Sequence, residues 1–111
     1  MSASKAKGTA FESLILEPAK AYYPDATRSP LMGVNDVGDL WLPDERRFIV
    51  EAKHHAALNL AGWANEAEKE ASNRGVPYWV VVHKRVGKGK GADQWATLTW
   101  GNLLALANSP R

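Results

Sequence analysis

The sequence predicts an α/β fold, with a mixed central sheet of about five strands flanked by helices. Apolar segments with strand-like patterns occur at 37–42, 47–53, 76–85 and 94–100. A helical pattern at 59–75 separates the second from the third of these strands, which permits a parallel crossover. With 111 residues, 45% of them hydrophobic, and five tryptophans, the chain has enough apolar material for one core.

The first elements are predicted from caps and breakers. A helix should begin at Thr9, because "TAFE" has the form of a capping box in which Glu12 reaches back to the backbone. Pro18 should kink this helix or divide it in two. A short strand is expected within "DATRSP" (25–30), ending before the proline.

The middle of the chain predicts a hairpin followed by a helix and a buried strand. "VGDLWL" (37–42) and "RFIVEAK" (47–53) are expected to pair through the turn "PDER". The helix at 59–75 should end at Gly75. "VPYWVVVHKR" is a continuous apolar strand, typical of burial on both faces. After the strand "QWATLTW", a final short helix is expected at 101–108.

Composition narrows the class of protein. No cysteine is present, which excludes disulfides and thiolate zinc sites and fits a reducing compartment. The sequence has no secretory signal and no apolar run long enough to cross a bilayer. We therefore expect a soluble, cytoplasmic protein with a flexible N-terminus at 1–8 and one domain over 9–111.

The charges are distributed unevenly. The net charge is +2 and the pI about 9.0, with acids gathered at 36–51 and bases at 83–91. An acidic pocket with basic flanks suits a metal-dependent enzyme that acts on a polyanion, although a mixed, solvated surface fits the charges nearly as well. Three further acids, Glu66, Glu68 and Glu70, are expected on the solvated side of the helix at 59–75.

Three ionisable residues lie in the hairpin segments. Because side chains alternate along a strand, Glu51 and Lys53 share one face, and pairing can place Asp39 beside Glu51. Adjacent carboxylates repel unless a cation lies between them, and Mg²⁺ or Mn²⁺ suits such oxygen ligands. A nearby lysine can orient water or stabilise a phosphate. The alternative is a hairpin surface with ordinary ion pairs.

These residues resemble a known family. "GD" (38–39), followed after a turn by "EAK" (51–53), is similar to the PD-(D/E)XK nuclease motif, although Gly38 stands where that motif often has proline. "KGTAFE" (7–12) resembles the opening of the archaeal-type Holliday junction resolvases and their phage relatives. The resemblance covers residues 7 to about 85.

The resemblance implies a restriction-endonuclease-like core and a Mg²⁺-dependent endodeoxyribonuclease, with Mn²⁺ able to substitute. In the implied site, Asp39 and Glu51 are the metal-binding acids and the Ala52 carbonyl is a further ligand. Lys53 is the implied catalytic lysine. Glu12 is an acid from the first helix, and Ser29 is a substrate contact. For Glu12, capping and metal contact remain equal alternatives. His55 shares the face of Glu51 and Lys53 and is expected to be solvated.

The run "KRVGKGKG" (84–91) joins two predicted strands. It is not a phosphate-binding P-loop, because it lacks the Lys-Ser/Thr ending and precedes no helix. We expect a flexible basic tip that contacts DNA phosphates; a merely solvated loop is the alternative. The full set expected to contact DNA is Lys7, Ser29, Lys84, Arg85, Lys88 and Lys90.

The sequence thus favours a structure-specific DNA endonuclease, most nearly a Holliday junction resolvase acting in DNA recombination or repair. Alternatives are a repair or restriction-like nuclease on the same fold, or a catalytically silent nucleic-acid-binding module. A bacterial, archaeal or phage-infected cell is the expected setting. Cutting two opposed strands favours a homodimer, for which Trp41, Trp100 and the segment 102–107 offer apolar surface.

Overall fold

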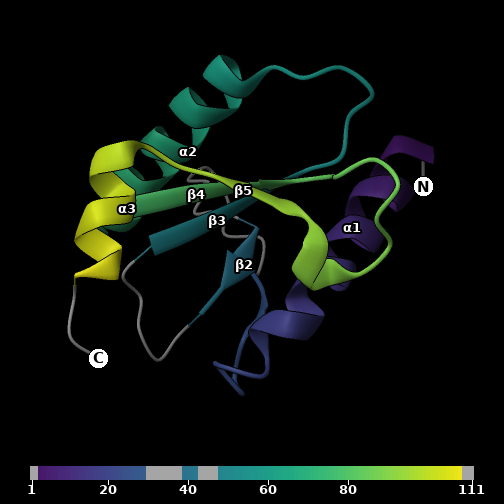
Figure 1. The fold of residues 1–111 in the computed structure, drawn as a ribbon, viewed down its shortest axis with the longest axis horizontal. Coiled ribbons are helices and arrows are strands. Elements are labelled where there is room, and N and C mark those ends of the chain that lie inside the picture. The colour runs from purple at the N-terminus through teal and green to yellow at the C-terminus, as the bar shows by residue number, and fades with distance from the viewer. Residues whose placement is uncertain (1–2, 30–38, 43–47, 109–111) are drawn as a thin grey trace.

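The computed structural model describes residues 3–29, 39–42 and 48–108. Within these ranges, helices and strands follow the predicted order of helix, three strands, helix, two strands, helix (Figure 1). The elements are α1 (Ala3–Ala19), β1 (Thr27–Arg28), β2 (Leu40–Trp41), β3 (Phe48–Lys53), α2 (Leu60–Arg74), β4 (Tyr78–His83), the 3-10 helix η1 (Gly91–Asp93), β5 (Trp95–Thr97) and α3 (Trp100–Ala107). The predicted turn at 43–46 lies outside the described residues.

The five strands form one open mixed sheet in the order β1-β2-β3-β4-β5. Strands β2 and β3 are antiparallel with Leu40 opposite Val50, which confirms the hairpin pairing. Strands β3 and β4 are parallel with Glu51 opposite Val81, and α2 supplies the crossover between them. The other neighbouring pairs are antiparallel. The coarse α/β class and the mixed sheet are therefore confirmed.

Helix α1 differs from its prediction at the N-terminal end. It begins at Ala3, so Thr9 and Glu12 lie in its interior and the predicted capping box is wrong. The residues before Thr9 include alanines and lysines, which favour helix and extend it backwards. Pro18 does not divide the helix, which continues to Ala19. None of the helices in the described ranges is long and apolar enough to cross a membrane.

Helix α2 begins after Asn59 and ends at Gly75, the predicted stop. The side chain of Asn59 accepts a hydrogen bond from the Gly62 N–H at 3.3 Å and caps the first turn. Gly75 adopts the left-handed conformation, with φ of 77°, and its N–H donates to the Ala71 carbonyl. These two local signals fix where the helix begins and ends.

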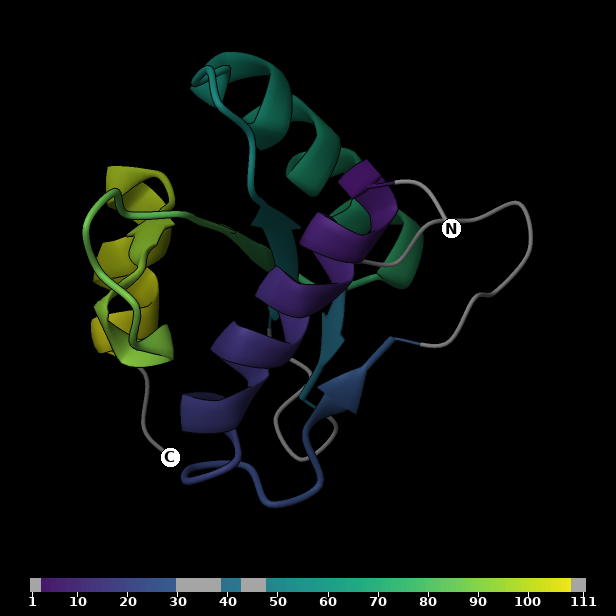
Figure 2. The same cartoon turned by 90° about the vertical axis from the view of Figure 1, so that its right-hand side faces the viewer.

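The sheet is covered on both faces. Figure 1 shows α2 above the strands and α1 to their lower right, and Figure 2 shows α1 crossing the strands. Along β3, Val50 packs on the α1 side and Ile49 on the α2 side, as the alternation predicts. The α1-side core contains Phe11, Ile15, Ala26, Leu40, Leu42, Val50 and Val80. The α2-side core contains Ile49, Trp63, Ala67, Ala71, Trp79 and Val81.

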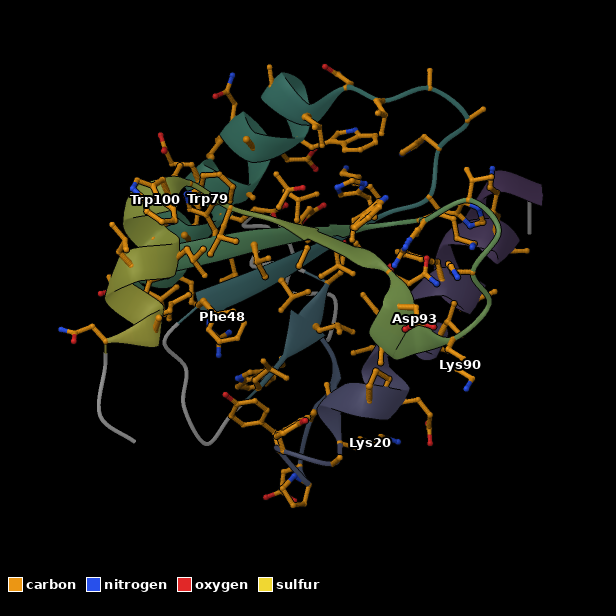
Figure 3. The ribbon with its side chains drawn as sticks, in the orientation of Figure 1. Lys20, Phe48, Trp79, Lys90, Asp93 and Trp100 are labelled. Atoms are coloured by element: carbon orange, nitrogen blue, oxygen red, sulfur yellow. The ribbon has the colours of Figure 1, made fainter. Side chains whose placement is uncertain are left out.

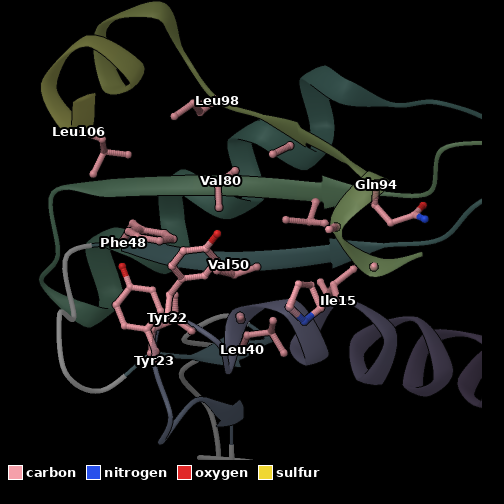
Figure 4. Close-up of a pocket in the computed structure, with 17 residues that line it drawn as sticks. Ile15, Tyr22, Tyr23, Leu40, Phe48, Val50, Val80, Gln94, Leu98 and Leu106 are labelled. Carbon is pink, nitrogen blue, oxygen red and sulfur yellow. The ribbon is translucent and has the colours of Figure 1, made fainter. Parts of the chain in front are cut away.

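An open apolar cavity of about 530 Å³ lies on the α1 side of the sheet. Figure 4 shows the rings of Tyr22, Tyr23 and Phe48 at one end of this cavity and Gln94 at the other. Helix α3 reaches the cavity through Leu106 but buries none of its residues. Three of its large apolar side chains, Trp100, Leu103 and Leu104, are exposed.

Candidate active-site cleft and basic loop

Asp39 is fastened to β3 through its backbone and its side chain. Its N–H donates to the Val50 carbonyl at 2.8 Å, and its Oδ2 accepts a hydrogen bond from the Ala52 N–H at 2.7 Å. The two partners, Val50 and Ala52, are the residues before and after Glu51. The strand pairing therefore holds the Asp39 carboxylate next to Glu51. The expected proximity of the two acids is thus a consequence of the observed strand pairing.

Glu51 is an acid in the core, with 4% of its surface exposed. Burial raises the pKa of Glu51 far above its ordinary value, and the hydrogen-bonded Glu70 carboxyl and the charge of Asp39 raise it further. Its Oε2 receives no hydrogen bond from any N–H of the described residues. Two carboxyl groups can share a hydrogen bond only when one is protonated, so Glu51 is strained as an anion without an added cation.

Lys53 bridges the sheet and α2. Its Nζ lies 3.4 Å from Glu51 Oε1 and 2.9 Å from Glu66 Oε2. Burial lowers the pKa of Lys53, but its hydrogen bond to Glu66 and the charge of Glu51 outweigh burial, so the pKa is raised overall. The lysine is therefore a firmly held cation beside Glu51.

Helix α2 brings two further acids to this place. One carboxylate oxygen from each of Glu51, Glu66 and Glu70 lies within 4.8 Å of the others. Glu70 is 2% exposed, so the expectation that it faces solvent is wrong. The helical period contained the signal, because Glu70 follows the buried Trp63 and Ala67 on the same face. Glu68 is exposed as expected, and Glu66 is exposed yet bonded to Lys53.

A cleft of about 260 Å³ opens between the start of α1 and the end of β3. It brings together six of the residues predicted from sequence as metal, catalytic or DNA-binding groups, from three separate segments. Its lining consists of Lys7, Gly8, Glu12, Asp39, Glu51, Ala52, Lys53, His54, His55 and Ala56. Acids and lysines that are distant in sequence thus share one small polar space.

Glu12 lines the cleft but has a partner of its own. Its Oε1 accepts a hydrogen bond from Arg28 Nε at 2.8 Å, which ties α1 to β1. With the capping box excluded, this ion pair is the observed role of the Glu12 side chain. No pattern in the sequence indicates it, because the two residues lie 16 positions apart and meet only through the tertiary fold.

Ser29 and the two histidines border the same region. The Ser29 N–H donates to the Asp39 carbonyl at 2.9 Å, and its buried hydroxyl has no hydrogen-bond partner among the described residues. Burial and the charges of Lys7 and Lys84 lower the pKa of His54. The exposed His55 packs against the Trp63 ring, with ring centres 5.7 Å apart.

The basic loop, residues 84–91, is held in place by buried Gln94. Gln94 Oε1 accepts a hydrogen bond from the Arg85 N–H at 2.7 Å, and its Nε2 donates to the Lys88 and Lys90 carbonyls at 3.0 and 2.8 Å. Lys84 Nζ also turns inward, to the carbonyls of Arg85 and Lys88. The expectation of a flexible tip missed these bonds, which give the loop a defined shape.

The four cations of this loop have different surroundings. The Lys84 ammonium is used within the loop, and the Arg85 guanidinium stacks over the Trp95 ring at 4.3 Å. Lys88 and Lys90 are exposed, and Figure 3 shows Lys90 at the opposite end of the molecule from Trp100. The side chains best placed to contact an external anion are therefore those of Lys88 and Lys90.

Comparison of the chain with protein-family models, curated proteins and solved structures gives no match.

Proposed function

We propose that this protein is a metal-dependent endonuclease that hydrolyses phosphodiester bonds in DNA. One observation carries the proposal: a buried Glu51, an Asp39 carboxylate fastened beside it, and the Lys53 ammonium share a single cleft. A structural ion pair does not need a second acid at this position, because that acid raises the pKa of Glu51 and opposes burial of the charge.

The residues present fit a divalent cation. Asp39 and Glu51 would supply carboxylate oxygens and Ala52 its carbonyl oxygen, which are ligands that Mg²⁺ and Mn²⁺ accept. Such an ion, when bound, supplies positive charge for the phosphate and the leaving oxygen. Glu12 is a further candidate ligand from α1, provided that it leaves Arg28. The high pKa of Glu51 indicates that it would lose a proton when a cation binds.

Lys53 is the proposed catalytic lysine. Its ammonium lies 3.4 Å from Glu51 Oε1 at the wall of the cleft, where it would orient the attacking water or stabilise negative charge on the phosphate. The bond to Glu66 keeps it protonated and directed, since that contact contributes to its raised pKa. A protonated lysine serves as an electrostatic stabiliser rather than as a base.

The fold is compatible with a restriction-endonuclease-like core, which we propose on the resemblance of "GD" and "EAK" to the PD-(D/E)XK motif. The hairpin β2–β3, which carries the acids, is flanked by α1 and followed by α2 and the parallel strand β4. The basic loop beside the cleft suits a polyanionic substrate.

We further propose a branched DNA substrate, such as a four-way junction, and a homodimer that presents two clefts. Among the predicted interface residues, Trp41 is covered by the Arg74 guanidinium at 4.5 Å, whereas Trp100 is exposed. Helix α3 carries no charge and exposes Leu103 and Leu104, so it is the better interface candidate. A monomer by light scattering at micromolar concentration, both free and with junction DNA, would contradict the dimer.

A catalytically silent DNA-binding module remains the second candidate. The observation that favours it is the engagement of Lys53 with Glu66 and of Glu12 with Arg28, which leaves both side chains already paired. In that case the cleft would be a charged joint between α1, β3 and α2. Binding would then depend on the basic loop and not on the acids.

The deciding experiment incubates the purified protein with synthetic four-way junctions, flaps and duplexes, with and without Mg²⁺. The proposed nuclease cuts only with the metal, and the Glu51→Gln variant does not cut. A repair or restriction-like enzyme would prefer flaps or duplexes to junctions. Binding without cleavage of any substrate, in Mg²⁺ and in Mn²⁺, would leave the silent module.

A further inference from the structure

The tip of the basic loop is a tight turn that presents an apolar side chain. The Lys88 N–H donates to the Arg85 carbonyl at 3.1 Å, and Gly87 has a φ of 83°, the value that a type II turn has at its third position. Val86 occupies the second position and is 94% exposed. A valine so placed contacts water on nearly every side.

This turn is rigidly supported from behind. Gln94 holds both of its ends, and η1, which precedes Gln94, packs against α1. At Gly91 the packing is so close that an added Cβ would lie 2.1 Å from the Leu14 carbonyl oxygen. Val86 is therefore a fixed projection, and a partner that binds it would not have to order the loop first.

The position and charge of the turn indicate what it would meet. The Lys84 N–H donates to the Lys53 carbonyl at 3.2 Å, so the loop starts directly beside the cleft. The loop contains Lys84, Arg85, Lys88 and Lys90 and no acid. An apolar tip among cations complements a polyanion that has apolar surface between its charges. A nucleic acid with unstacked bases fits this description, because the bases offer apolar faces and the phosphates carry the charge.

We propose that Val86 is a wedge residue that enters an unstacked base step next to the bond held in the cleft, while Lys88 and Lys90 contact the flanking phosphates. This proposal rests on the proposed function and adds how the substrate would be selected. Separating two stacked bases costs least where the stack is already interrupted, as at a branch or a gap. Val86 would therefore favour interrupted DNA over continuous duplex.

The test measures DNA binding without divalent metal, so that cleavage does not interfere. Wild type, Val86→Ser, Val86→Leu and the control Tyr22→Ser would each be titrated into a continuous duplex and a branched DNA that carries 2-aminopurine at the branch. Tyr22 is also exposed, but it lies at the other end of the apolar cavity from Gln94, the residue that holds the loop (Figure 4). All four proteins carry the same charge.

We expect Val86→Ser to lower the preference for branched over continuous DNA by about tenfold, the low end expected for the loss of one buried aliphatic side chain. It should also remove the rise in 2-aminopurine fluorescence, while Val86→Leu keeps both. Tyr22→Ser should leave both the preference and the fluorescence rise unchanged.

Two results overturn the wedge: Val86→Ser with an unchanged preference and fluorescence rise, or a wild-type protein that binds no DNA. The first result leaves the proposed nuclease standing, because Mg²⁺-dependent cleavage is measured separately on the same proteins. Conversely, a Val86-dependent preference in a protein that never cuts supports the wedge and overturns the nuclease.

Discussion

The acidic cleft and the basic loop meet at the end of β3. They differ in whether their polar and charged groups find partners within the protein. In the loop, the polar groups of Lys84 and Gln94 bond to neighbouring backbone groups, and Lys88 and Lys90 remain in solvent. In the cleft, Glu51 is buried near other acids, with Lys53 as a cation in contact. The loop is complete without a ligand, whereas the cleft is balanced only when a proton or another cation is added.

This difference separates two kinds of binding region. A preformed surface such as the loop binds with little reorganisation and is expected to set affinity and substrate preference. A cleft in which burial and neighbouring like charges disfavour the ionised form of a carboxyl group is typical of catalytic sites. Such sites often hold ionisable groups with shifted pKa values.

The largest effect is expected on cleavage. Asp39→Asn, Glu51→Gln and Lys53→Ala should each lower the cleavage rate by about a hundredfold or more, because each removes charge at the proposed reacting centre. DNA affinity and the circular dichroism spectrum should remain close to wild type. Glu68→Gln on the exposed side of α2 is the matched control and should cut normally. Near-normal cleavage by any two of the three cleft variants would make the site assignment wrong.

Metal binding should stabilise the folded protein through the same acids. A ligand present at a hundred times its dissociation constant adds about 2.7 kcal/mol to the free energy of unfolding. Thermal unfolding of wild type should therefore shift upward with Mg²⁺ or Mn²⁺ and return after chelation. The shift should vanish in Glu51→Gln and persist in Glu68→Gln. An equal shift in both variants would place the metal outside the cleft.

The pH dependence of stability should report Glu51 directly. Its pKa is raised above 4.5 in the folded state, so above pH 4.5 the unfolded chain releases a proton that the folded protein retains. This group therefore lowers stability as pH rises from about 5 towards 8, by at most about 1.4 kcal/mol per pH unit. In urea unfolding without metal, Glu51→Gln should flatten the slope and be more stable than wild type at pH 8. A wild-type slope that matches the variant would show that folding does not raise the pKa of Glu51.

The smallest effect is expected from the shape of the loop. Gly91→Ala places a Cβ against the Leu14 carbonyl and should displace the loop, whereas Gly89→Ala meets open space. We expect a several-fold loss of DNA affinity for Gly91→Ala only, without any change of charge. Equal affinities for the two glycine variants would make the loop shape irrelevant to binding.

The charge of the loop is tested by the salt dependence of DNA binding. Neutralising both Lys88 and Lys90 should lower the slope of log affinity against log salt by about 0.9 for each phosphate that the loop no longer neutralises.

Local signals account for much of what the sequence could predict. Asn59 and Gly75 bound α2 by direct contacts with adjacent backbone, and the alternation of β3 assigns its two faces correctly. The pairing of Asp39 with β3 follows from the hairpin, so the two strand acids and Lys53 could be grouped without the structure. Each of these inferences depends on residues close in sequence or on strand pairing.

The features that were missed depend on tertiary context. An acid is ordinarily solvated, and this tendency concealed that Glu70 lies on the buried face of α2. Glu12 and Arg28 meet only after α1 packs beside β1. "TAFE" matched a capping pattern, yet the preceding residues continue the helix and leave Thr9 no helix end to cap. The role of Gln94 arises from three backbone groups that converge on its amide.

The contact between Gly91 and α1 also bears on the order in which the protein folds. Pro18 has no N–H to donate to the Leu14 carbonyl. Gly91, which lies 77 residues after Leu14 in the chain, packs against that carbonyl. A contact of such long sequence separation forms late, because the intervening chain must first be brought together. The basic loop would therefore acquire its shape after the sheet and α1 have assembled. In pulse-labelling hydrogen exchange, protection of the Arg85 amide would follow that of β3 and β4.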